Sequence, residues 1–228
     1  MPKKHDQIII RSLPNIPEVT SFSNISILIS NSLDKNNIKL KNKDVLVITQ
    51  KIISKAENRL IHKNSIIPSN RAIKLSKQIH KNAKLTQLIL DESKRIIKKK
   101  HGVVITETHH GFICANSGID QSNVPINYFC LLPINPDNSA KKIRLFLEKK
   151  YKIKISVIIS DTFGRPFRTG QIDVAIGVSG LSPLLNYKGK NDNYGRKINV
   201  TSIAIADELA SAAELLLCKT SNTPVALI

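Results

Sequence analysis

The sequence predicts an α/β protein with mixed sheets and amphipathic helices on its surface. Short apolar runs of the β type recur along the chain, and apolar residues at helical spacing lie between several of them. No fixed-period repeat, low-complexity tract or long linker divides the 228 residues, of which 41% are apolar. A chain of this size can bury a core without disulfides or a structural metal. We therefore expect a single module over residues 1–228, in one or two lobes.

Seven segments have the composition and pattern of β-strands. Two of them form a hairpin-like pair around Gly111, which places His109 and His110 at a hairpin tip. A metal site at these histidines is the weaker interpretation, because neighbours on a strand point to opposite faces. The full set is Gln7–Arg11, Asp44–Thr49, Val103–Thr108, Phe112–Ala115, Ile155–Ser160, Ile172–Val178 and Ile198–Ile205.

Apolar residues recur near the helical period of 3.6 residues in three places. These are Leu85–Ile97, Ile143–Leu147 and the Ala-rich segment Asp207–Leu217. In the first two segments the lysines fall elsewhere on the helical wheel, which indicates amphipathic surface helices rather than membrane-binding ones. Pro68 followed by Ser69 predicts the N-cap of a further helix.

The cysteines and the longest apolar runs exclude several classes of protein. Cys114, Cys130 and Cys218 form no Cys-x-x-Cys pair, so a disulfide framework and a structural zinc site are not expected. Cys114 and Cys130 have apolar neighbours and should behave as small core residues. The longest apolar run, Tyr128–Leu132, is far too short for a membrane span or a signal peptide. We expect a soluble protein of a reducing cytoplasm.

The chain is strongly basic, with 35 Lys and Arg against 17 Asp and Glu and a formal charge of +18. Ten of the bases, against two acids, lie between Arg71 and Lys100. Nucleic acid, an anionic membrane or a phosphate-bearing substrate would each favour such clustering. The 35 Ile and 20 Asn that accompany 27 Lys are typical of an AT-rich coding sequence, so solvated lysine-rich faces are the first interpretation. Aromatic residues are only 4% and do not alternate with bases as in base-stacking surfaces.

Polar residues concentrate in three segments that follow an expected strand or a glycine-bearing turn, where α/β sheets tend to place ligands. The first is residues 50–59. Its Lys51, Ser54 and Lys55 can present ammonium and hydroxyl groups to a phosphate, although no glycine is present for a Walker-type loop. The alternative is a charged strand with Lys55 and Glu57 in solvent, and the residue chemistry alone slightly favours it.

The second segment, residues 116–123, contains small polar residues together with Gly118 and Asp120. It fits an Asx-type turn without function. It also offers carboxylate and amide oxygens, which are the ligands that hard cations prefer. Taken alone, the segment favours the turn.

The third segment, Ser160–Gln171, is the most informative one. It follows an apolar strand and combines Asp161 and Thr162 with a glycine and two arginines, Arg165 and Arg168. An acid and a hydroxyl at a strand end, followed by arginines, make a plausible site for a metal and a phosphate.

Two carboxylates from separate segments, Asp120 and Asp161, would let one or two Mg²⁺ or Mn²⁺ ions bridge the phosphate oxygens of a nucleotide. The arginines would then neutralise charge that develops in the transition state. In the structural alternative, Arg168 pairs with Asp173 and Asp161 caps a turn. We favour the functional interpretation, because a hydrophobic core has no use for these groups.

Four segments occur in an order and spacing that match one known family. They are Gln50–Glu57, Asn116–Asn123, Ser160–Pro166 and Gln171–Gly177. Through them the chain resembles the coenzyme F420-0:glutamate ligase family, also called F420 gamma-glutamyl ligases. The match runs from Leu13 to Val225 and therefore covers nearly the whole chain.

The resemblance implies a GTP-dependent ligase of coenzyme F420 biosynthesis. Such ligases add L-glutamate by γ-linkage to the deazaflavin F420-0, through an acyl-phosphate intermediate that the glutamate amine attacks. The resemblance further implies Mg²⁺ or Mn²⁺, with two ions expected and K⁺ as a further candidate. It also implies an α/β fold that assembles as an intertwined homodimer with the active site near the subunit contact. A fused oxidoreductase domain, which some bacterial relatives carry, is not expected.

The family's functional residues carry over position by position. Nucleotide contacts would fall on Leu13, Pro14, Ile16, Gln50, Lys51, Lys55 and Asn123. Metal ligands would fall on Asp120, Asp161 and Thr162. The expected catalytic residues are Asp161, Arg165 and Arg168, of which the two arginines are assigned from their charge.

Two departures from the family pattern concern the site. Asn58 stands where relatives often have glycine, and asparagine is the residue that best replaces glycine in a left-handed turn. The loop Lys219–Thr223 stands where the family has a Gly-rich or acidic loop, and the family's tail beyond it has no counterpart before Ile228. Two other classes stay open. One is a nucleotide- or deazaflavin-binding relative with reduced catalysis, and the other is a basic nucleic-acid-binding protein, which would explain the charge of +18.

Overall fold

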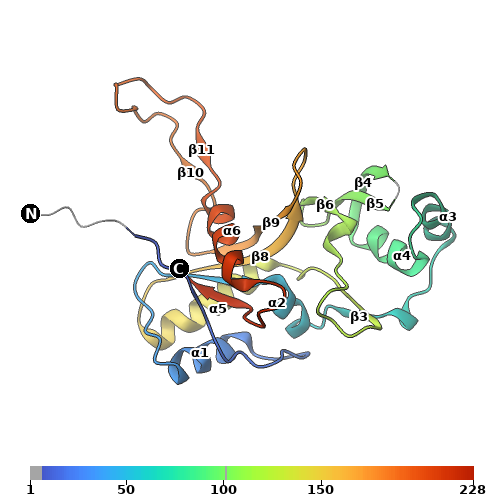
Figure 1. The fold of residues 1–228 in the computed structure, drawn as a ribbon, viewed down its shortest axis with the longest axis horizontal. Helices are drawn as coiled ribbons and strands as arrows, with labels where there is room; N and C mark the ends of the chain where they lie inside the picture. The colour runs from blue at the N-terminus through green and yellow to red at the C-terminus, as the bar shows by residue number, and fades with distance from the viewer. Residues whose placement is uncertain (1–6, 101) are drawn as a thin grey trace, which may run out of the picture.

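The structure is a computed structural model that describes residues 7–100 and 102–228. Its architecture is mixed α/β, as the sequence predicts, with helices packed around several sheets (Figure 1). The strands are β1 (Arg11–Ser12), β2 (Val45–Thr49), β3 (Leu60–His62), β4 (Ser93–Lys100), β5 (Val103–Thr108), β6 (Ile113–Ala115), β7 (Tyr128–Cys130), β8 (Ser156–Gly164), β9 (Gln171–Ser179), β10 (Leu185–Asn186), β11 (Ser202–Ile203) and β12 (Val225–Leu227). The helices are α1 (Ile25–Lys35), α2 (Gln50–Ala56), α3 (Asn70–Ile79), α4 (Ala83–Asp91), α5 (Pro136–Tyr151) and α6 (Ile205–Leu217).

The central sheet has five strands in the order β1-β12-β2-β8-β9. Strands β2 and β8 run parallel, with Val45 opposite Ser156 and Thr49 opposite Ser160. The other neighbouring pairs of this sheet are antiparallel. Strand β2 ends at Thr49, opposite Ser160, whereas β8 does not end at Ser160 as expected but continues to Gly164 by pairing with β9. The residues that follow β2 therefore emerge beside the second half of β8, which contains Asp161 and Thr162.

The two faces of the central sheet bury alternate residues of the same strands, as the two-residue period of a strand requires. On one face, Leu46 and Ile48 of β2 pack in a core with α1, α2 and α5. On the other face, Val47 of β2 and Ile158 of β8 pack against alanines of α6, including Ala210. The near-continuous apolar runs in these strands are therefore explained by burial on both sides.

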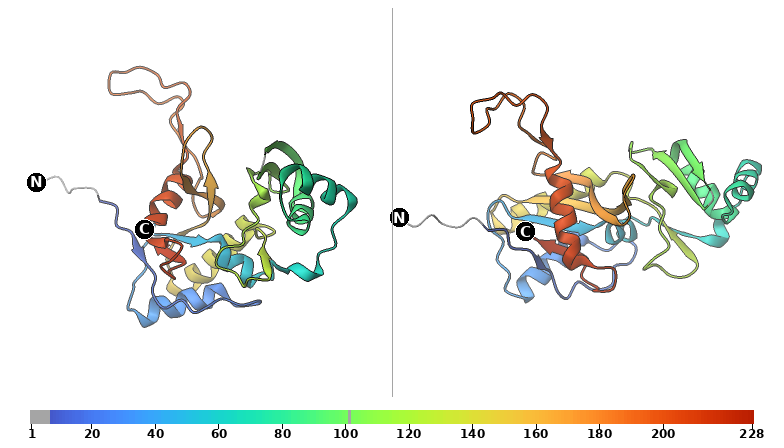
Figure 2. Two further views of the ribbon diagram at one scale, coloured as in Figure 1. Left: turned by 45° about the vertical axis from the view of Figure 1, so that its right-hand side comes forward. Right: turned by 45° about the horizontal axis from the view of Figure 1, so that its top comes forward.

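A second hydrophobic core lies apart from the central sheet. It joins α3 and α4 to residues of β3, β5 and β7, and Ile79, Ile89 and Phe129 are among its most buried side chains. This lobe forms the green part of the ribbon, at the right of Figure 1 and of both views in Figure 2. Ser69 caps α3 by accepting a hydrogen bond from the backbone N–H of Ala72, which confirms the N-cap expected after Pro68.

The helix expected over Leu85–Ile97 is wrong in its second half. Helix α4 ends at Asp91, and the lysine-rich stretch that follows it is β4, which pairs antiparallel with β5. Gly102, with φ of +78°, lies between β4 and β5 in a left-handed conformation that glycine adopts without strain. The apolar pair at Ile96 and Ile97 fits both periods, so tertiary pairing rather than local pattern decides the outcome.

Two expected strands are much shorter than the sequence suggests. Of Gln7–Arg11 only Arg11 is in a strand, and of Ile198–Ile205 only Ser202–Ile203 is. The second segment belongs largely to a projecting arm, residues 184–203, that stands away from the body in Figures 1 and 2. Val200 on this arm is 91% exposed, because no sheet lies beside it to bury its apolar side chains.

Several other local expectations agree with the structure. The segments at Ile143–Leu147 and Asp207–Leu217 lie within α5 and α6. His110 lies in the turn between β5 and β6, where its Nε2 is 2.8 Å from the carbonyl oxygen of Pro133. Burial raises the pKa of the Cys114 thiol to about 12, with a further contribution from the charge of Asp161, so this cysteine is unreactive. None of the helices in the described part of the chain is long and apolar enough to cross a membrane.

The outer edge of the central sheet is covered by carboxylates. Backbone N–H groups of β9 donate to Asp137 of α5 at 2.7 Å and to Asp207 and Glu214 of α6 at 2.9 Å each. An uncovered edge strand would leave these N–H groups free to pair with another chain. The same contacts hold α6 against the sheet beside the cavity described below.

Gly177 of β9 marks the closest approach between the sheet and α5. A Cβ atom at this position would lie 2.5 Å from the backbone carbonyl carbon of Pro136. We expect Gly177→Ala to lower the free energy of unfolding by about 2 kcal/mol or more, since the backbone of α5 must shift. Urea denaturation measures this loss, with Gly164→Ala as the matched control, because a Cβ at Gly164 meets open space. Equal stability of the two variants would contradict the tight packing.

Candidate active site

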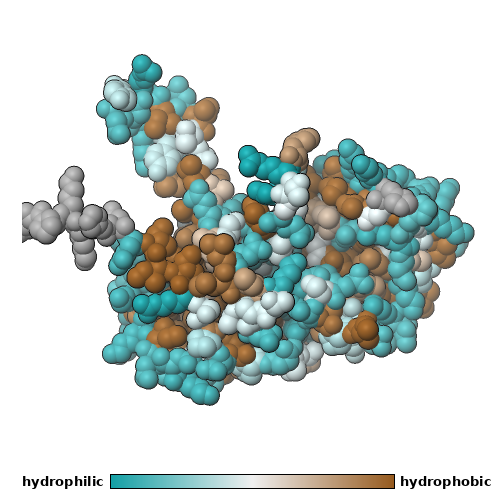
Figure 3. All heavy atoms as spheres, viewed as in Figure 1, coloured by the Kyte–Doolittle hydropathy of each residue, from teal (hydrophilic) through white to brown (hydrophobic). Residues whose placement is uncertain are grey.

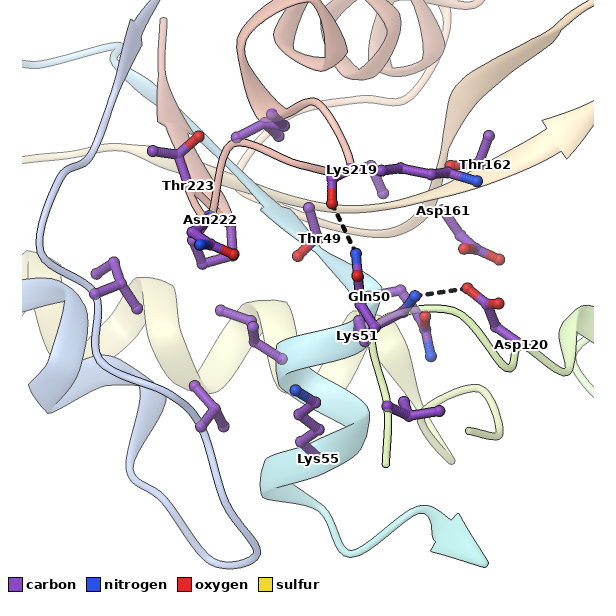
Figure 4. A pocket seen from close by; sticks show the side chains of 18 of the residues that line it. Thr49, Gln50, Lys51, Lys55, Asp120, Asp161, Thr162, Lys219, Asn222 and Thr223 are labelled. Carbon is purple, nitrogen blue, oxygen red and sulfur yellow. Dashed lines mark hydrogen bonds and ion pairs between the residues drawn. The ribbon is translucent and has the colours of Figure 1, made fainter. Parts of the chain in front are cut away.

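A cavity of about 680 Å³ opens beside the end of β2 and the second half of β8. The bulge between Ile159 and Ser160 lies next to it, and bulges commonly re-aim side chains beside functional sites. The cavity's polar lining comes from segments far apart in the sequence, several of which Figure 4 shows. These residues are Glu18, Thr49, Gln50, Lys51, Lys55, Asp120, Asn123, Ser160, Asp161, Thr162, Asp173, Glu214, Lys219, Asn222 and Thr223.

The first polar segment forms a helix rather than a charged strand. Helix α2 begins directly after β2, and the i, i+4 spacing of Lys51 and Lys55 places both on the face that lines the cavity. Lys55 is buried and its Nζ donates to Glu18, so it does not extend into solvent. The turn after α2 has Asn58 at φ of +56°, which confirms that asparagine takes the left-handed position.

Gln50 anchors α2 to the second lobe. Its side chain is 2% exposed, and its Nε2 donates to Ser54 Oγ within the helix and to the carbonyl oxygen of Leu131 at 3.1 Å. Leu131 directly follows β7, whose last residue, Cys130, forms an isolated antiparallel β-bridge with Asp120. The contact therefore ties α2 to the segment that lies beside Asp120. The amide of Gln50 thus fixes the position of the lysine that follows it.

Lys51 and Asp120 form an ion pair across the cavity (Figure 4). Lys51 Nζ donates to Asp120 Oδ2 at 2.6 Å and to the carbonyl oxygen of Ser122 at 2.6 Å. Asp120 also accepts the backbone N–H of Ser122 at 2.7 Å, so the expected Asx-type turn exists and at the same time presents its carboxylate to the cavity. Burial by itself would raise the pKa of Asp120, but the hydrogen bonds from Lys51 and Ser122 outweigh it and lower the pKa.

Asp161 has the opposite electrostatic environment. Burial raises its pKa to about 7, and the negative charges of Asp173 and Asp120 add to the shift. A backbone hydrogen bond at Thr162 and the charge of Lys51 act in the other direction but do not prevail. Figure 4 shows the carboxylates of Asp120 and Asp161 next to each other at the same side of the cavity. The structure therefore brings together the two acids that the sequence suggested would meet.

Asp173 supports this arrangement from behind. It is 5% exposed, and its two carboxylate oxygens accept hydrogen bonds from Ser160 Oγ and Thr162 Oγ1, each at 2.8 Å. Because the Thr162 hydroxyl gives its proton to Asp173, its lone pairs remain available to a cation in the cavity. Sequence reasoning considered Asp173 only as a partner for Arg168, and that pair is not formed in the described residues.

The oxygen donors fit a divalent cation that is shared with a ligand. Asp120, Asp161 and Thr162 supply two carboxylates and a hydroxyl at one side of the cavity. A cation bound there would offset the burial and the neighbouring negative charges that raise the pKa of Asp161. Among residues 7–100 and 102–228, no group of three or more His, Cys, Asp and Glu side chains could hold a metal by itself. Mg²⁺ is commonly bound by one or two carboxylates, and substrate phosphates and water then complete its coordination.

Some of the residues expected at the site lie elsewhere. Leu13 is fully buried, and Pro14 binds Ser32 through its carbonyl oxygen, whereas Ile16 does line the cavity. Arg165 and Arg168 lie at the turn between β8 and β9 and are not among the residues that line the cavity.

Arg165 is held by its own turn. Its guanidinium donates to the carbonyl oxygens of Thr169 at 2.6 Å and Gly170 at 3.4 Å. The role in phosphate binding that was assigned to the two arginines from their charge thus has no support from the geometry of this turn.

The loop that follows α6 also contributes to the lining of the cavity. Asn123, which the family resemblance assigns to the nucleotide, has φ of +52° and donates from Nδ2 to the carbonyl oxygen of Lys219 at 2.9 Å. Lys219, Asn222 and Thr223 line the cavity and had no expected role, because their loop departs from the family pattern. Glu18 and Glu214 were also missed, since nothing local distinguishes them from surface acids.

Comparisons with known proteins agree with the motifs. A family model described as F420-0:Gamma-glutamyl ligase matches residues 14–228. The protein of Methanocaldococcus jannaschii named Coenzyme F420:L-glutamate ligase is 48% identical over 186 residues, which cover 81% of this chain and 74% of that protein. Proteins of the same name from Methanococcus maripaludis and Methanothermobacter thermautotrophicus are 47% and 44% identical, and cover 83% and 89% of this chain and 75% and 80% of their own lengths. The chain therefore belongs to the F420-0:gamma-glutamyl ligase family.

Proposed function

We propose that this protein is a coenzyme F420-0:L-glutamate ligase that uses GTP to add glutamate by γ-linkage. The observation that carries the proposal is the meeting of Asp120, Asp161 and Thr162 with Lys51 and Lys55 in one open cavity. Acids, a hydroxyl and ammonium groups in this arrangement are typical of phosphoryl transfer, which needs positioning and charge stabilisation more than a protein nucleophile. The names of the relatives supply L-glutamate and coenzyme F420, and the description of the family supplies F420-0.

The nucleotide is proposed to bind with its phosphates toward the two aspartates. The cavity volume, about 680 Å³, is within the range of small-molecule sites. Ile16, Lys51 and Lys55 line it directly, and Asn123 connects it to the loop after α6. Gln50 acts through α2, which its buried amide fixes in place.

Asp120, Asp161 and Thr162 are proposed to hold Mg²⁺ or Mn²⁺. The ion would neutralise charge on the phosphate oxygens and align the terminal phosphoryl group. Asp173 keeps the Thr162 hydroxyl turned so that its lone pairs are free. Lys51 must share Asp120 with the ion, because it binds Oδ2 of this carboxylate at 2.6 Å. The proposal also includes two divalent ions and a monovalent K⁺, as the family resemblance implies.

The proposed reaction has two steps, phosphoryl transfer and amide formation. A carboxylate oxygen of F420-0 attacks the γ-phosphorus of GTP, the bond to the β-phosphate oxygen breaks, and GDP leaves with that electron pair. The glutamate amine then attacks the acyl-phosphate carbon, loses a proton, and inorganic phosphate leaves as the amide forms. The chain's own contribution is to align the reacting groups and to exclude water that would hydrolyse the acyl phosphate.

A homodimer of the cytoplasm is also part of the proposal. Apolar side chains are exposed on the arm, including Leu184 and Val200, and on α6, including Leu215. Figure 3 shows brown, apolar surface gathered at the base of the arm, on a face that is otherwise largely hydrophilic. A second copy could cover this surface, since contiguous apolar patches on soluble proteins commonly mark interaction sites. Cys114, Cys130 and Cys218 are free thiols, which suits a reducing compartment.

Mass spectrometry of F420-0 incubated with the protein, GTP, Mn²⁺ and glutamate tests the function. We expect products that carry one or more additional glutamyl residues, with GDP and phosphate released in proportion. Omission of F420-0 is the control and should stop GDP release, whereas omission of glutamate should limit GDP release to about one equivalent per active site. GTP binding without product would support the relative with reduced catalysis. Binding of oligonucleotides that falls steeply with salt, without any GTP turnover, would support the nucleic-acid-binding protein.

A further inference from the structure

Three lysines line the cavity, and two of them are already paired. Lys51 binds Asp120 at 2.6 Å, and Lys55 binds Glu18. Lys219 is the third, and no hydrogen bond or ion pair of its side chain is found within the part of the chain that the structure describes. Its ammonium group is therefore the cation of this cavity that is available to an incoming anion.

The backbone of Lys219 is held while its side chain stays free. Asn123 Nδ2 donates to its carbonyl oxygen at 2.9 Å, which joins the loop to the turn that carries Asp120. Ser221 Oγ donates to the carbonyl oxygen of Cys218 at 2.8 Å, and Thr223 Oγ1 to that of Leu216 at 3.2 Å. In Figure 4 the Lys219 side chain extends from this loop toward the side of the cavity where Asp161 and Thr162 lie.

The charges of the cavity make this cation necessary. Five carboxylates, from Glu18, Asp120, Asp161, Asp173 and Glu214, line the cavity together with the three lysines. A polyphosphate that enters beside these acids is repelled unless cations accompany or meet it. A bound divalent ion can supply part of that charge, whereas the arginines at the turn between β8 and β9 do not line the cavity.

We propose that Lys219 binds the terminal phosphoryl group of the polyphosphate substrate and fills the position first assigned to Arg165 and Arg168. This inference rests on the proposed function and goes beyond it by naming a substrate-binding side chain. Lys219 approaches from the loop after α6, opposite the lysines of α2, so the phosphate chain would have cations on both sides. An ammonium group is well suited here because it acts as a point charge with three donors.

Calorimetric titration of GTP, inorganic tripolyphosphate and guanosine, each with Mn²⁺, tests the proposal. We expect Lys219→Met to weaken the affinity for GTP and for tripolyphosphate by about 10- to 100-fold, as for the loss of one charge-assisted hydrogen bond. Guanosine affinity should not change. Lys219→Arg should restore tripolyphosphate binding to within about threefold of the wild-type value, since arginine also binds phosphate.

Lys142→Met is the matched control, because Lys142 is exposed on α5 and does not line the cavity. Unchanged tripolyphosphate affinity of Lys219→Met, or equal weakening of guanosine binding, would overturn the proposal, as would a wild-type protein that binds no tripolyphosphate. Thermal melting of each variant verifies that the loop substitution leaves the fold intact.

The ligase assay on the same samples separates this inference from the proposed function. Wild-type protein that binds tripolyphosphate through Lys219 but adds no glutamate to F420-0 would refute the function and keep the phosphate site. Glutamate addition that Lys219→Met leaves unchanged in both kcat and KM for GTP would refute the role of Lys219 alone.

Discussion

Asp161→Asn should abolish turnover and at the same time stabilise the metal-free protein. The variant loses one of the two carboxylates proposed to hold the divalent ion, and we expect kcat to fall by about 100- to 1,000-fold or more, as for loss of a central electrostatic group. The gain in stability arises because this carboxylate is destabilised in the folded state, where burial and the charges of Asp173 and Asp120 raise its pKa to about 7.

The pH dependence of this gain follows from the direction of the pKa shift. An acid whose folded pKa lies above its unfolded value of about 3.9 stabilises the fold least at high pH, because the unfolded chain ionises first. As the pH rises, the destabilisation begins near the unfolded pKa and reaches its full size above pH 7. Asparagine removes it, so the variant should gain up to about 4 kcal/mol at pH 8.5 and much less at pH 5.

Urea denaturation in the presence of EDTA at both pH values measures the effect of Asp161→Asn. Glu208→Gln is the control, because Glu208 is an exposed acid of α6 that does not line the cavity. Lower stability of Asp161→Asn than of wild type at pH 8.5 would show that the carboxylate is not strained in the free protein. Full turnover of the variant would remove Asp161 from the site.

The parts of the site that the sequence revealed are those that follow its apolar strand segments. The apolar parts of β2 and β8 were recognisable from their composition as Asp44–Thr49 and Ile155–Ser160, and the acids and lysines after them stand out as unsuited to a core. Parallel pairing places Thr49 opposite Ser160, so Lys51 and Asp161 both come just after this point. The family resemblance assigned both residues to one site, and this pairing explains how they meet, although β8 itself continues through Asp161 to Gly164.

The residues that sequence reasoning missed or misplaced are positioned by the register of paired strands and by the direction of side chains. Asp173 reaches Thr162 because these two residues lie opposite each other on β9 and β8, a pairing that follows the bulge at Ser160. No local pattern specifies such a bulge. Arg165 and Arg168 were assigned from charge, which does not indicate where a side chain lies. Both belong to the turn between β8 and β9, and neither lines the cavity.

Loss of Lys51 should have the second large effect, with a pH dependence opposite to that of Asp161→Asn. Lys51→Met removes the ammonium that donates to Asp120 Oδ2 at 2.6 Å, and Asp120 is then left beside Asp161 without its partner. We expect kcat/KM for GTP to fall by about 100-fold, since both a substrate-facing cation and the position of a metal ligand are lost. Stability at pH 7 should fall by about 1–2 kcal/mol, because the pair is only partly buried.

The sign of this second pH dependence follows from the lowered pKa of Asp120. Hydrogen bonds from Lys51 and Ser122 hold it below its usual value against the opposing effect of burial, so the pair stabilises the fold above the unfolded pKa. This stabilisation is lost as the pH falls through the folded pKa. The difference between wild type and Lys51→Met should therefore be large at pH 7 and shrink toward pH 3, as long as both proteins remain folded.

A double-mutant cycle with Asp120→Asn isolates the pair from its surroundings. If the two side chains act through each other, Lys51→Met costs less stability in the Asp120→Asn background than in wild type. Additive losses would instead assign the effect of Lys51 to Ser122, whose carbonyl oxygen it also binds. Because Asp161→Asn gains stability as the pH rises while Lys51→Met loses it, the two variants report on two carboxylates of the same cavity with opposite sign. A general loosening of the cavity would shift both variants in the same direction, so opposite slopes can arise only if the two acids have distinct environments.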